Sequence, residues 1–322
     1  MPFFVHRPAL PLQTGSCMDH HAKTAIAIIV TLVLAVAAEI FLIGRSGGSD
    51  KTQSSEKRGK EEAKTETVFF QSDRISEIKA DLSSCDLKFS QWDESRIELT
   101  IASDRNEDDR PYALLKDNAV VIAEDRQEHT SLDNTSIDIR VPRTMPVEIN
   151  NFFVSVKTTG GAVSVNDFTC GVFDVKTAGG KIVFDSCSFT ALSLESETGT
   201  VVCTKTDAHS AHITSKSGRI RYAGSCDYID AASKKGGINF SADAMMREAS
   251  FECERESINI ALHENDGYTL EYAAPDGKVK DAFTNTDAKG SGSVRYKNGE
   301  ASIKVKTESG NINITRSPSS AL

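Results

Sequence analysis

The sequence is poor in several residue types that mark large protein classes. Its 322 residues contain seven cysteines, eight prolines and one tryptophan, and aromatic residues make up only 7%. Seven cysteines are too few for a disulfide-rich scaffold of this length, and the odd number leaves at least one cysteine unpaired within the chain. Basic residues are outnumbered, because 37 Lys and Arg stand against 46 Asp and Glu, a net charge of −9. That sign disfavours nucleic-acid binding, so we expect no nucleic-acid partner.

Long hydrophobic runs are absent except for one near the N-terminus. Residues 24–44 read TAIAIIVTLVLAVAAEIFLIG, with Glu39 as the sole charge. A helix of this length spans about 30 Å, the thickness of the hydrocarbon core of a bilayer. We therefore expect a cytoplasmic segment at 1–23 and a transmembrane signal anchor at 24–44. The protein would be a single-pass protein of the cell membrane, with its C-terminal domain extracytoplasmic.

A second interpretation of the N-terminus stays open. If translation starts at Met18, a short apolar stretch precedes Ala35-Val36-Ala37, which has the small-x-small pattern of a signal-peptidase site. The apolar run continues for several residues beyond Ala37, as in an uncleaved anchor. Both interpretations export the rest of the chain.

Residues 45–66 have little capacity to form folded structure. The segment RSGGSDKTQSSEKRGKEEAKTE contains Ala63 as its only apolar residue. Such a segment cannot bury enough surface to offset the entropy lost on ordering, so we expect a disordered linker. At the other end, residues 317–322 are expected to be a short tail.

The chain after residue 150 contains an internal repeat. Strings such as KTTGGAVSV, KTAGGKIVF and SKSGRIRY recur with spacings of 18 to 20 residues. Apolar residues stand seven and five positions before one shared column, and again two and four positions after it. The residues in that column are Gly161, Gly180, Gly199, Gly218, Gly236 and then Glu256, with Gly310 equivalent near the C-terminus.

This spacing predicts two short strands per repeat, each with alternating inward and outward side chains, joined by a turn at the glycine. One such unit cannot cover its own apolar side, whereas stacked copies bury a continuous interior. We therefore expect an all-β fold, a β-solenoid or β-helix-like stack of roughly 19-residue repeats over residues 151–316 of a domain spanning 67–316.

The turn glycines suggest a backbone with positive φ, which other residues avoid. Glu256 replaces glycine in the column, so we expect a distorted rung there. Asp266-Gly267 and Asp276-Gly277 are typical of hairpin turns, and the pattern around Gly292 indicates a return of the repeat.

Residues 67–150 carry strand signals without a clear period. Alternation is plainest in Ile97–Ile101 and Ile137–Val141. We expect an irregular cap and the first rungs here, because an open end of a solenoid is an unpaired sheet edge that must be covered. The other expected strands are Ile75–Leu82, Asp86–Phe89, Val120–Ile122 and Val147–Ile149.

No cluster in the sequence has the pattern of a catalytic, cofactor or metal site. His209 and His212 lie three residues apart, and strand side chains three apart point to opposite faces, so we expect solvated loop histidines rather than metal ligands. Acidic residues do not pair at a repeated column beside Lys or Arg. A carbohydrate-active β-helix enzyme is therefore the less favoured alternative.

Several cysteines lie within the repeats. Cys203 replaces an aliphatic residue of an inward column and is expected to act as small apolar filler. Cys170 and Cys187 fall on successive rungs, where stacking could bring them together in a disulfide. The alternative is that both are free thiols.

Three segments match a known arrangement: Ile75–Ile101 (ISEIKADLSSCDLKFSQWDESRIELTI), Ile137–Pro142 (IDIRVP) and Lys306–Arg316 (KTESGNINITR). With the repeats between them, they resemble the bacterial putative-adhesin family, a β-strand-repeat domain of unknown function found in Lia-type and Yvl-type envelope-stress proteins. The resemblance implies an exported, often membrane-anchored, non-enzymatic protein. Such proteins are linked to cell-surface adhesion or to sensing envelope damage of the kind that cationic antimicrobial peptides cause.

The acid excess lies in the expected β-domain. Residues 1–66 contain 8 basic and 7 acidic residues, and residues 67–322 contain 29 and 39, a net charge of −10. The acid could attract cationic partners or could simply keep a long β-stack soluble. We expect an adhesin-like binding or structural module of the bacterial envelope, with an envelope-stress sensor as the alternative. The expected partners are cationic peptides, cell-wall polymers or a membrane regulatory partner.

Overall fold

The structure, a computed structural model, describes residues 63–125, 134–145 and 147–317. Within these ranges no helix is long and apolar enough to cross a membrane. The expected segments at 1–23 and 24–44 and most of the expected linker and tail lie outside the described residues, so the anchor stays a prediction. The linker ends earlier than expected, because Lys64 already begins a strand.

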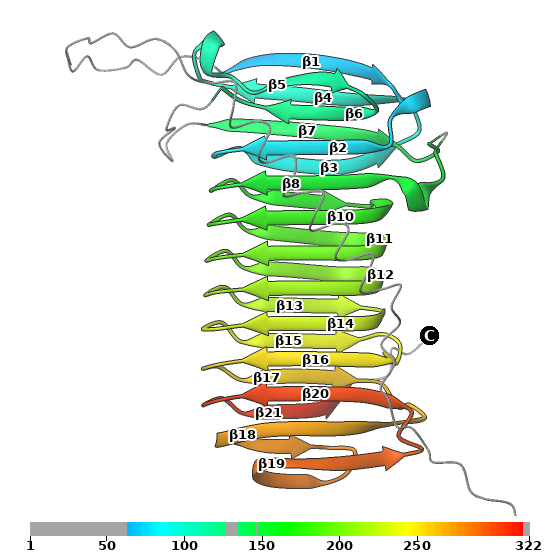
Figure 1. Ribbon diagram of the computed structural model, residues 1–322, viewed down its shortest axis with the longest axis vertical. Coiled ribbons are helices and arrows are strands. Elements are labelled where there is room, and N and C mark those ends of the chain that lie inside the picture. Colours follow the sequence, from blue (N-terminus) through cyan, green and yellow to red (C-terminus); the bar gives the residue numbers. More distant parts are fainter. Residues whose placement is uncertain (1–62, 126–133, 146, 318–322) are drawn as a thin grey trace, which may run out of the picture. The chain divides into compact units, whose positions relative to one another are not determined.

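The described chain is built from β-strands, with short 3-10 turns at Ser72–Arg74, Glu107–Asp109 and Ile149–Asn151. All the strands belong to one hydrogen-bonded sheet that winds into a stack (Figure 1). In chain order they are β1 (Lys64–Gln71), β2 (Glu77–Leu82), β3 (Asp86–Trp92), β4 (Arg96–Ser103), β5 (Tyr112–Lys116), β6 (Ala119–Ala123), β7 (Thr135–Pro142), β8 (Phe153–Thr158), β9 (Val163–Asn166), β10 (Thr169–Thr177), β11 (Ile182–Ser196), β12 (Val201–Ser215), β13 (Ile220–Gly224), β14 (Cys226–Ser233), β15 (Ile238–Ala242), β16 (Glu248–Cys253), β17 (Ile258–Leu262), β18 (Gly267–Asp281), β19 (Thr286–Lys297), β20 (Ala301–Thr307) and β21 (Ile312–Arg316).

Each regular rung has two strand segments, one on either side of the interior, joined by the turn of the glycine column. We call the side before this turn the first face and the side after it the second face. In spatial order, the first face contains β5, β6, β2, β8, β10, the second halves of β11 and β12, β14, β16, β20 and the first half of β18. The second face contains β1, β4, β7, β3, β9, the first halves of β11 and β12, β13, β15, β17, β21 and the second half of β18.

The regular rungs are parallel and in register, so each inward position forms a column along the stack. Val156, Val175 and Leu194, for example, are direct partners on successive rungs. The inward side chains form one continuous buried apolar cluster. Its aromatic part packs edge to face, with the ring centroid of Phe173 5.2 Å from that of Phe89 and 5.1 Å from that of Phe184. Side chains therefore fill the space between the two faces.

At the N-terminal end, the order of rungs in space differs from their order in the chain. The first rung, β2 with β3, lies between β6 and β7 on one side and β8 and β9 on the other. Beyond β6 and β7 lie only antiparallel strands, β5 on the first face and β4 followed by β1 on the second. Two of these cap strands, β1 and β5, were not predicted, and the expected strand at 147–149 does not form.

The C-terminal end shows the same change of order. The last rung in the chain consists of β20 and β21. It lies between the rung of β16 and β17 and the strand β18, although β18 comes before it in the sequence (Figure 1). The prediction of a hairpin at Asp276-Gly277 is wrong, because these residues form the turn between the two halves of β18. Gly292 lies in the antiparallel strand β19 and begins no parallel repeat. Asp266-Gly267 leads into β18, so the hairpin of this region joins β18 to β19 instead.

The rung that carries Glu256 keeps the regular strand register. Ile258 pairs directly with Ile238 on one side and with Ile312 on the other. The prediction of a distorted rung is therefore wrong for its strands. The extra length of this repeat is taken up in the connection between β15 and β16.

Candidate functional site

The turn glycines stack in one column, but not because of positive φ, which none of them has. A Cβ added to Gly180 would lie 1.8 Å from the carbonyl oxygen of Gly161, and one added to Gly199 would lie 1.9 Å from that of Gly180. Glycine is required because each turn packs directly on the main chain of the preceding rung. The same close approach, at 1.7 to 2.1 Å, is found at Gly161, Gly218, Gly236 and Gly310.

Positive φ occurs instead at a second corner of the rung, six residues after the glycine column. Asp167, Ser186 and Lys205 have φ values of 50°, 57° and 48°, and Gly224 is the equivalent residue of the next rung. Three of these four residues at the second corner are therefore not glycine, whereas the column glycines lie where the main chains of two rungs touch.

A buried column of small polar residues, which the sequence analysis missed, lies three residues before the glycine, and hydroxyl groups of this column support several of the turns. The Thr177 hydroxyl accepts a hydrogen bond from the Gly180 N–H at 3.0 Å. The Ser233 hydroxyl accepts one from the Gly236 N–H at 3.0 Å and donates to the Gly218 carbonyl, one rung earlier, at 3.3 Å. The signal was present as a Ser or Thr three residues before each column glycine. Its buried members are Thr158, Thr177, Ser196, Ser215, Ser233 and Thr307, with Cys253 in the equivalent place.

Every cysteine among the described residues is a buried free thiol, so the Cys170–Cys187 disulfide is not formed in the structure. Cys170 pairs in register with Phe189, which leaves Cys187 two positions out of register. Two residues along a strand and one strand spacing separate Cα atoms by about 8 Å, more than a disulfide spans. The Cys187 thiol donates instead to the Asp185 carbonyl at 3.2 Å, and burial raises its pKa to about 11.

His209 and His212 lie on β12, so the prediction that they are loop residues is wrong. Both are exposed, because two consecutive outward residues, His209 and Ser210, mark a bend in the strand. The Nδ1 atom of each histidine lies 3.1 Å from a carboxylate of β14, that of Asp227 for His209 and that of Asp230 for His212. The two pairs therefore bridge the same two rungs on the first face.

Ser193, His212 and Asp230 share one outward column on three successive rungs, in the order of a Ser–His–Asp triad. The hydrogen bond to Asp230 raises the pKa of His212. The Ser193 side chain, however, hydrogen-bonds Asp174, whose own pKa is raised by burial. The strand N–H groups nearby are used in the parallel ladders, so this flat face offers no pair of free donors to stabilise an oxyanion.

The described residues form open surface depressions with charged side chains in their walls. One of about 470 Å³ lies on the first face near the N-terminal end. Two of its wall residues, Lys176 and Glu195, pair with each other at 3.3 Å. Among the described residues, no group of three His, Cys, Asp or Glu side chains is placed to hold a metal ion.

A buried ion pair lies in the N-terminal cap. The side chains of Arg105 and Glu124 are each 2% exposed and are in direct contact. Burial opposes the charge on Glu124, but hydrogen bonds from Ser83 and Arg105 outweigh it and lower the pKa of the carboxyl. The Cys85 thiol lies 3.9 Å from the same carboxylate. The pair thus joins the end of β6 to the segment after β4, and Glu124 also accepts a hydrogen bond from the Ser83 N–H in the turn between β2 and β3.

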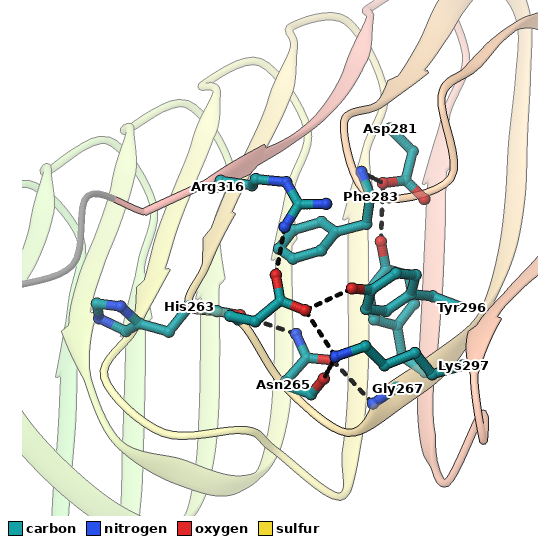
Figure 2. A network of polar contacts seen from close by, with 10 residues as sticks. His263, Asn265, Gly267, Asp281, Phe283, Tyr296, Lys297 and Arg316 are labelled. Atoms are coloured by element: carbon teal, nitrogen blue, oxygen red, sulfur yellow. Dashed lines mark hydrogen bonds and ion pairs between the residues drawn. The ribbon is translucent and has the colours of Figure 1, made fainter.

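A polar network closes the C-terminal end of the stack (Figure 2). Glu264 lies at its centre and accepts hydrogen bonds from the Tyr296 hydroxyl at 2.5 Å and from Lys297 Nζ at 2.6 Å, while its other oxygen accepts one from Arg316. The bonds from Lys297 and Tyr296 lower the pKa of Glu264 to about 2. Since these residues lie at the ends of β17, β19 and β21, the network ties the terminal hairpin to the last regular rungs.

Aromatic rings pack beneath this network. The ring centroid of Phe283 lies 5.2 Å from that of Tyr296 and 5.8 Å from that of Tyr268, and the Arg316 guanidinium lies 4.3 Å from the Phe283 centroid. The Tyr268 hydroxyl donates to the buried Asp281 carboxylate at 2.8 Å. Figure 2 shows Arg316, Phe283 and Tyr296 close together, whereas the His263 side chain points away from them.

Comparison with known proteins identifies one matching family and several solved structures. The family model described as Toastrack DUF4097 matches residues 75–315. A putative adhesin from Parabacteroides distasonis ATCC 8503 is 13% identical and aligns over 78% of this chain and 97% of its own, with a TM-score of 0.41. A putative adhesin from Bacteroides fragilis NCTC 9343 is 12% identical over 79% and 97%, with a TM-score of 0.38. The chain matches no curated protein sequence.

Proposed function

The chain belongs to the Toastrack DUF4097 family, a β-repeat family of unknown function, and on that premise we propose that it is a non-enzymatic binding scaffold of the bacterial cell envelope. The observation that carries this proposal is the filled interior. Buried apolar side chains occupy the space between the two faces, so a ligand can contact only outward side chains and turns.

The regular outward columns suit an extended partner with a repeating structure. Parallel rungs in register present equivalent side chains at the strand spacing of about 4.8 Å. On the second face, Asn313 donates to Asn259 at 2.9 Å, and Asn259 donates to Asn239 at 2.8 Å. A row of fixed polar groups favours a polymer of the cell wall over a small substrate.

In this proposal the segment 24–44 anchors the protein in the cell membrane, and the β-domain lies outside the cytoplasm. The buried free cysteines are compatible with this placement. Burial raises the pKa of thiols such as Cys187 and Cys226, each to about 11, which keeps them protonated and poorly reactive. Such thiols can persist in an exported domain without pairing at random.

The test is cosedimentation of the purified full-length protein with protein-free cell-wall sacculi, alongside an acidic control protein of similar size. We expect saturable binding of the full-length protein only, and no release of soluble saccharide during prolonged incubation. No binding at low salt would contradict the scaffold function. Release of saccharide would contradict the non-enzymatic assignment.

A second candidate function is an envelope-stress sensor that binds cationic peptides. It is favoured by the N-terminal cap, where Glu107, Asp108 and Asp109 form one acidic 3-10 turn at the surface. Substitution of all three by Asn should abolish binding of a cationic peptide if this turn is the contact. Unchanged peptide binding by the variant, or none by the native protein, would rule the turn out as the sensor site.

A further inference from the structure

The turns in the middle of the stack, together with the start of β13, carry a basic cluster on a domain that is acidic overall. We name this cluster the basic ridge and define it as Arg219, Arg221, Lys234, Lys235 and Arg255. All five side chains are exposed. The net charge of the chain conceals the ridge, because the acid that outweighs it is distributed elsewhere.

The ridge residues lie on three successive rungs. Arg219 and Arg221 belong to the rung of β12 and β13, Lys234 and Lys235 to that of β14 and β15, and Arg255 to that of β16 and β17. Main-chain hydrogen bonds join these turns directly, as in the bond from the Lys235 N–H to the Lys216 carbonyl at 3.1 Å. The positive charges therefore repeat along the stack axis at a spacing of about 4.8 Å.

The ridge is not neutralised by the protein itself. Some surface cations elsewhere have acidic partners on a neighbouring rung, such as Lys216 with Glu197 at 2.5 Å and Lys306 with Glu252 at 2.7 Å. Within the described chain, the five ridge side chains form no ion pair, and the carboxylates in the same turns are those of Glu254 and Glu256. Like charges on adjacent strands repel one another, so this arrangement does not serve stability.

Protection of a sheet edge does not explain the ridge either. Charged residues guard edge strands against pairing with other chains, but β12 to β17 lie in the middle of the stack, with partners on both sides. A row of unpaired cations at this place is suited to an external anion. Guanidinium and ammonium groups are the usual protein ligands of phosphate oxygens.

We propose that the basic ridge binds a linear polymer of phosphodiester-linked polyols, lying along the stack axis across the turns. This inference rests on the proposed envelope function and names the class of partner. Nucleic acids carry the same phosphodiester charge, but proteins that bind single-stranded nucleic acids also stack aromatic side chains on the bases. The large apolar side chains that are exposed, such as Phe153 and Tyr228, do not belong to the ridge turns.

The test measures binding of poly(glycerol phosphate) to the full-length protein across a salt series. The ridge variant is Lys234→Gln/Lys235→Gln/Arg255→Gln. Its matched control is Lys278→Gln/Lys280→Gln/Lys289→Gln, which removes the same charge from exposed lysines of β18 and β19. We expect the ridge variant to bind at least about tenfold more weakly at low salt, with the slope of log K against log salt reduced by about 2. The control should change affinity less than about threefold, and Lys234→Arg/Lys235→Arg should retain binding.

Equal losses in the ridge and control variants, or no loss in either, would overturn the proposal. Equal or tighter binding of a single-stranded oligonucleotide or of anionic lipid vesicles would overturn the assigned partner. If the ridge variant sediments with cell walls as the native protein does, the basic ridge is not the binding site, whereas the scaffold function is supported. If the native protein binds poly(glycerol phosphate) but not cell walls, and the ridge variant no longer binds the polymer, the proposal for the basic ridge holds and the envelope function is wrong.

Discussion

Buried hydroxyl groups hold several turns in the middle of the stack, whereas charged groups hold the caps at its two ends. In a middle rung, the Ser233 hydroxyl joins its own glycine N–H to the carbonyl of the preceding turn. The N-terminal cap uses the buried pair of Arg105 and Glu124, and the C-terminal cap uses Glu264 with its cationic partners. A repeat can satisfy its polar groups through an identical neighbour, but an end has no such neighbour.

The ends also differ from the middle in the order of the chain. At the N-terminal end, β2 and β3 lie between the pair of β6 and β7 and the pair of β8 and β9. At the C-terminal end, β20 and β21 lie between the pair of β16 and β17 and the strand β18. As a result, the strands at the open edges are the antiparallel β1, β5 and β19. The regular rungs on either side are thereby paired on both of their edges.

The largest effect is expected from adding a single methyl group to the glycine column. Gly180→Ala places a Cβ 1.8 Å from the Gly161 carbonyl oxygen, so the turns must move apart, at a cost of about 3 kcal/mol or more in the free energy of unfolding. The adjacent Gly179→Ala is the control, because its Cβ would meet nothing closer than 3.6 Å. Denaturant unfolding should separate the two variants, and similar stabilities would show that the turns are not in close contact.

The next largest effect is expected at the N-terminal cap. Glu124→Ala removes one partner of a buried ion pair and should lower the free energy of unfolding by about 3 kcal/mol at neutral pH. Because the pKa of Glu124 is lowered in the folded protein, its contribution is complete above the unfolded value of about 4.3 and is lost as the pH falls through the lower folded value. The difference from the native protein should therefore shrink in acid, and a constant difference would contradict the assigned charge.

A smaller effect is expected from the hydroxyl column. Ser233→Ala leaves the Gly236 N–H and the Gly218 carbonyl without this partner and should cost about 1 to 2 kcal/mol. Ser233→Thr keeps the hydroxyl, as Thr177 does in its own rung, and should remain close to the native stability. If the threonine variant melts at a lower temperature than the alanine variant, the hydroxyl is not what stabilises this turn.

The smallest effect is expected at the exposed C-terminal network. Glu264→Gln should lower the melting temperature slightly at neutral pH, and Glu271→Gln, an exposed carboxylate of the same cap, should leave it unchanged. The pKa of about 2 in the folded protein means that the Glu264 contribution is present above pH 4 to 5 and is lost as the pH falls towards 2. A Glu264→Gln effect that persists at pH 2 would show that charge is not its cause.

The inward columns and the family were predictable from the sequence, and the family resemblance is confirmed by the match over residues 75–315. The strands β2 and β3 were expected within the irregular first rungs, but their match to the repeat was not predicted, because Cys85 takes the place of the glycine. Their inward residues Ile78, Ala80, Leu87 and Phe89 nevertheless stand at the usual offsets from that column.

Other features could not be predicted because they depend on contacts between rungs. The sequence signal of Gly180 is the same whether glycine relieves a positive φ or a close main-chain contact, and only the position of Gly161 distinguishes them. The order of rungs at the C-terminal end is similarly hidden, because Ile258 can pair equally well with any strand that carries the same columns. The basic ridge was overlooked because its residues lie on different repeats, whose charges combine only when the turns stack.

Amide hydrogen exchange of the full-length protein, read by mass spectrometry, tests most directly the claim that the last rung in the chain is enclosed in the stack. The account predicts that β20 and β21 exchange as slowly as β12, and that β19, which precedes them in sequence, exchanges faster. Protection that falls steadily towards the C-terminus, with β20 and β21 less protected than β18 and β19, would contradict it.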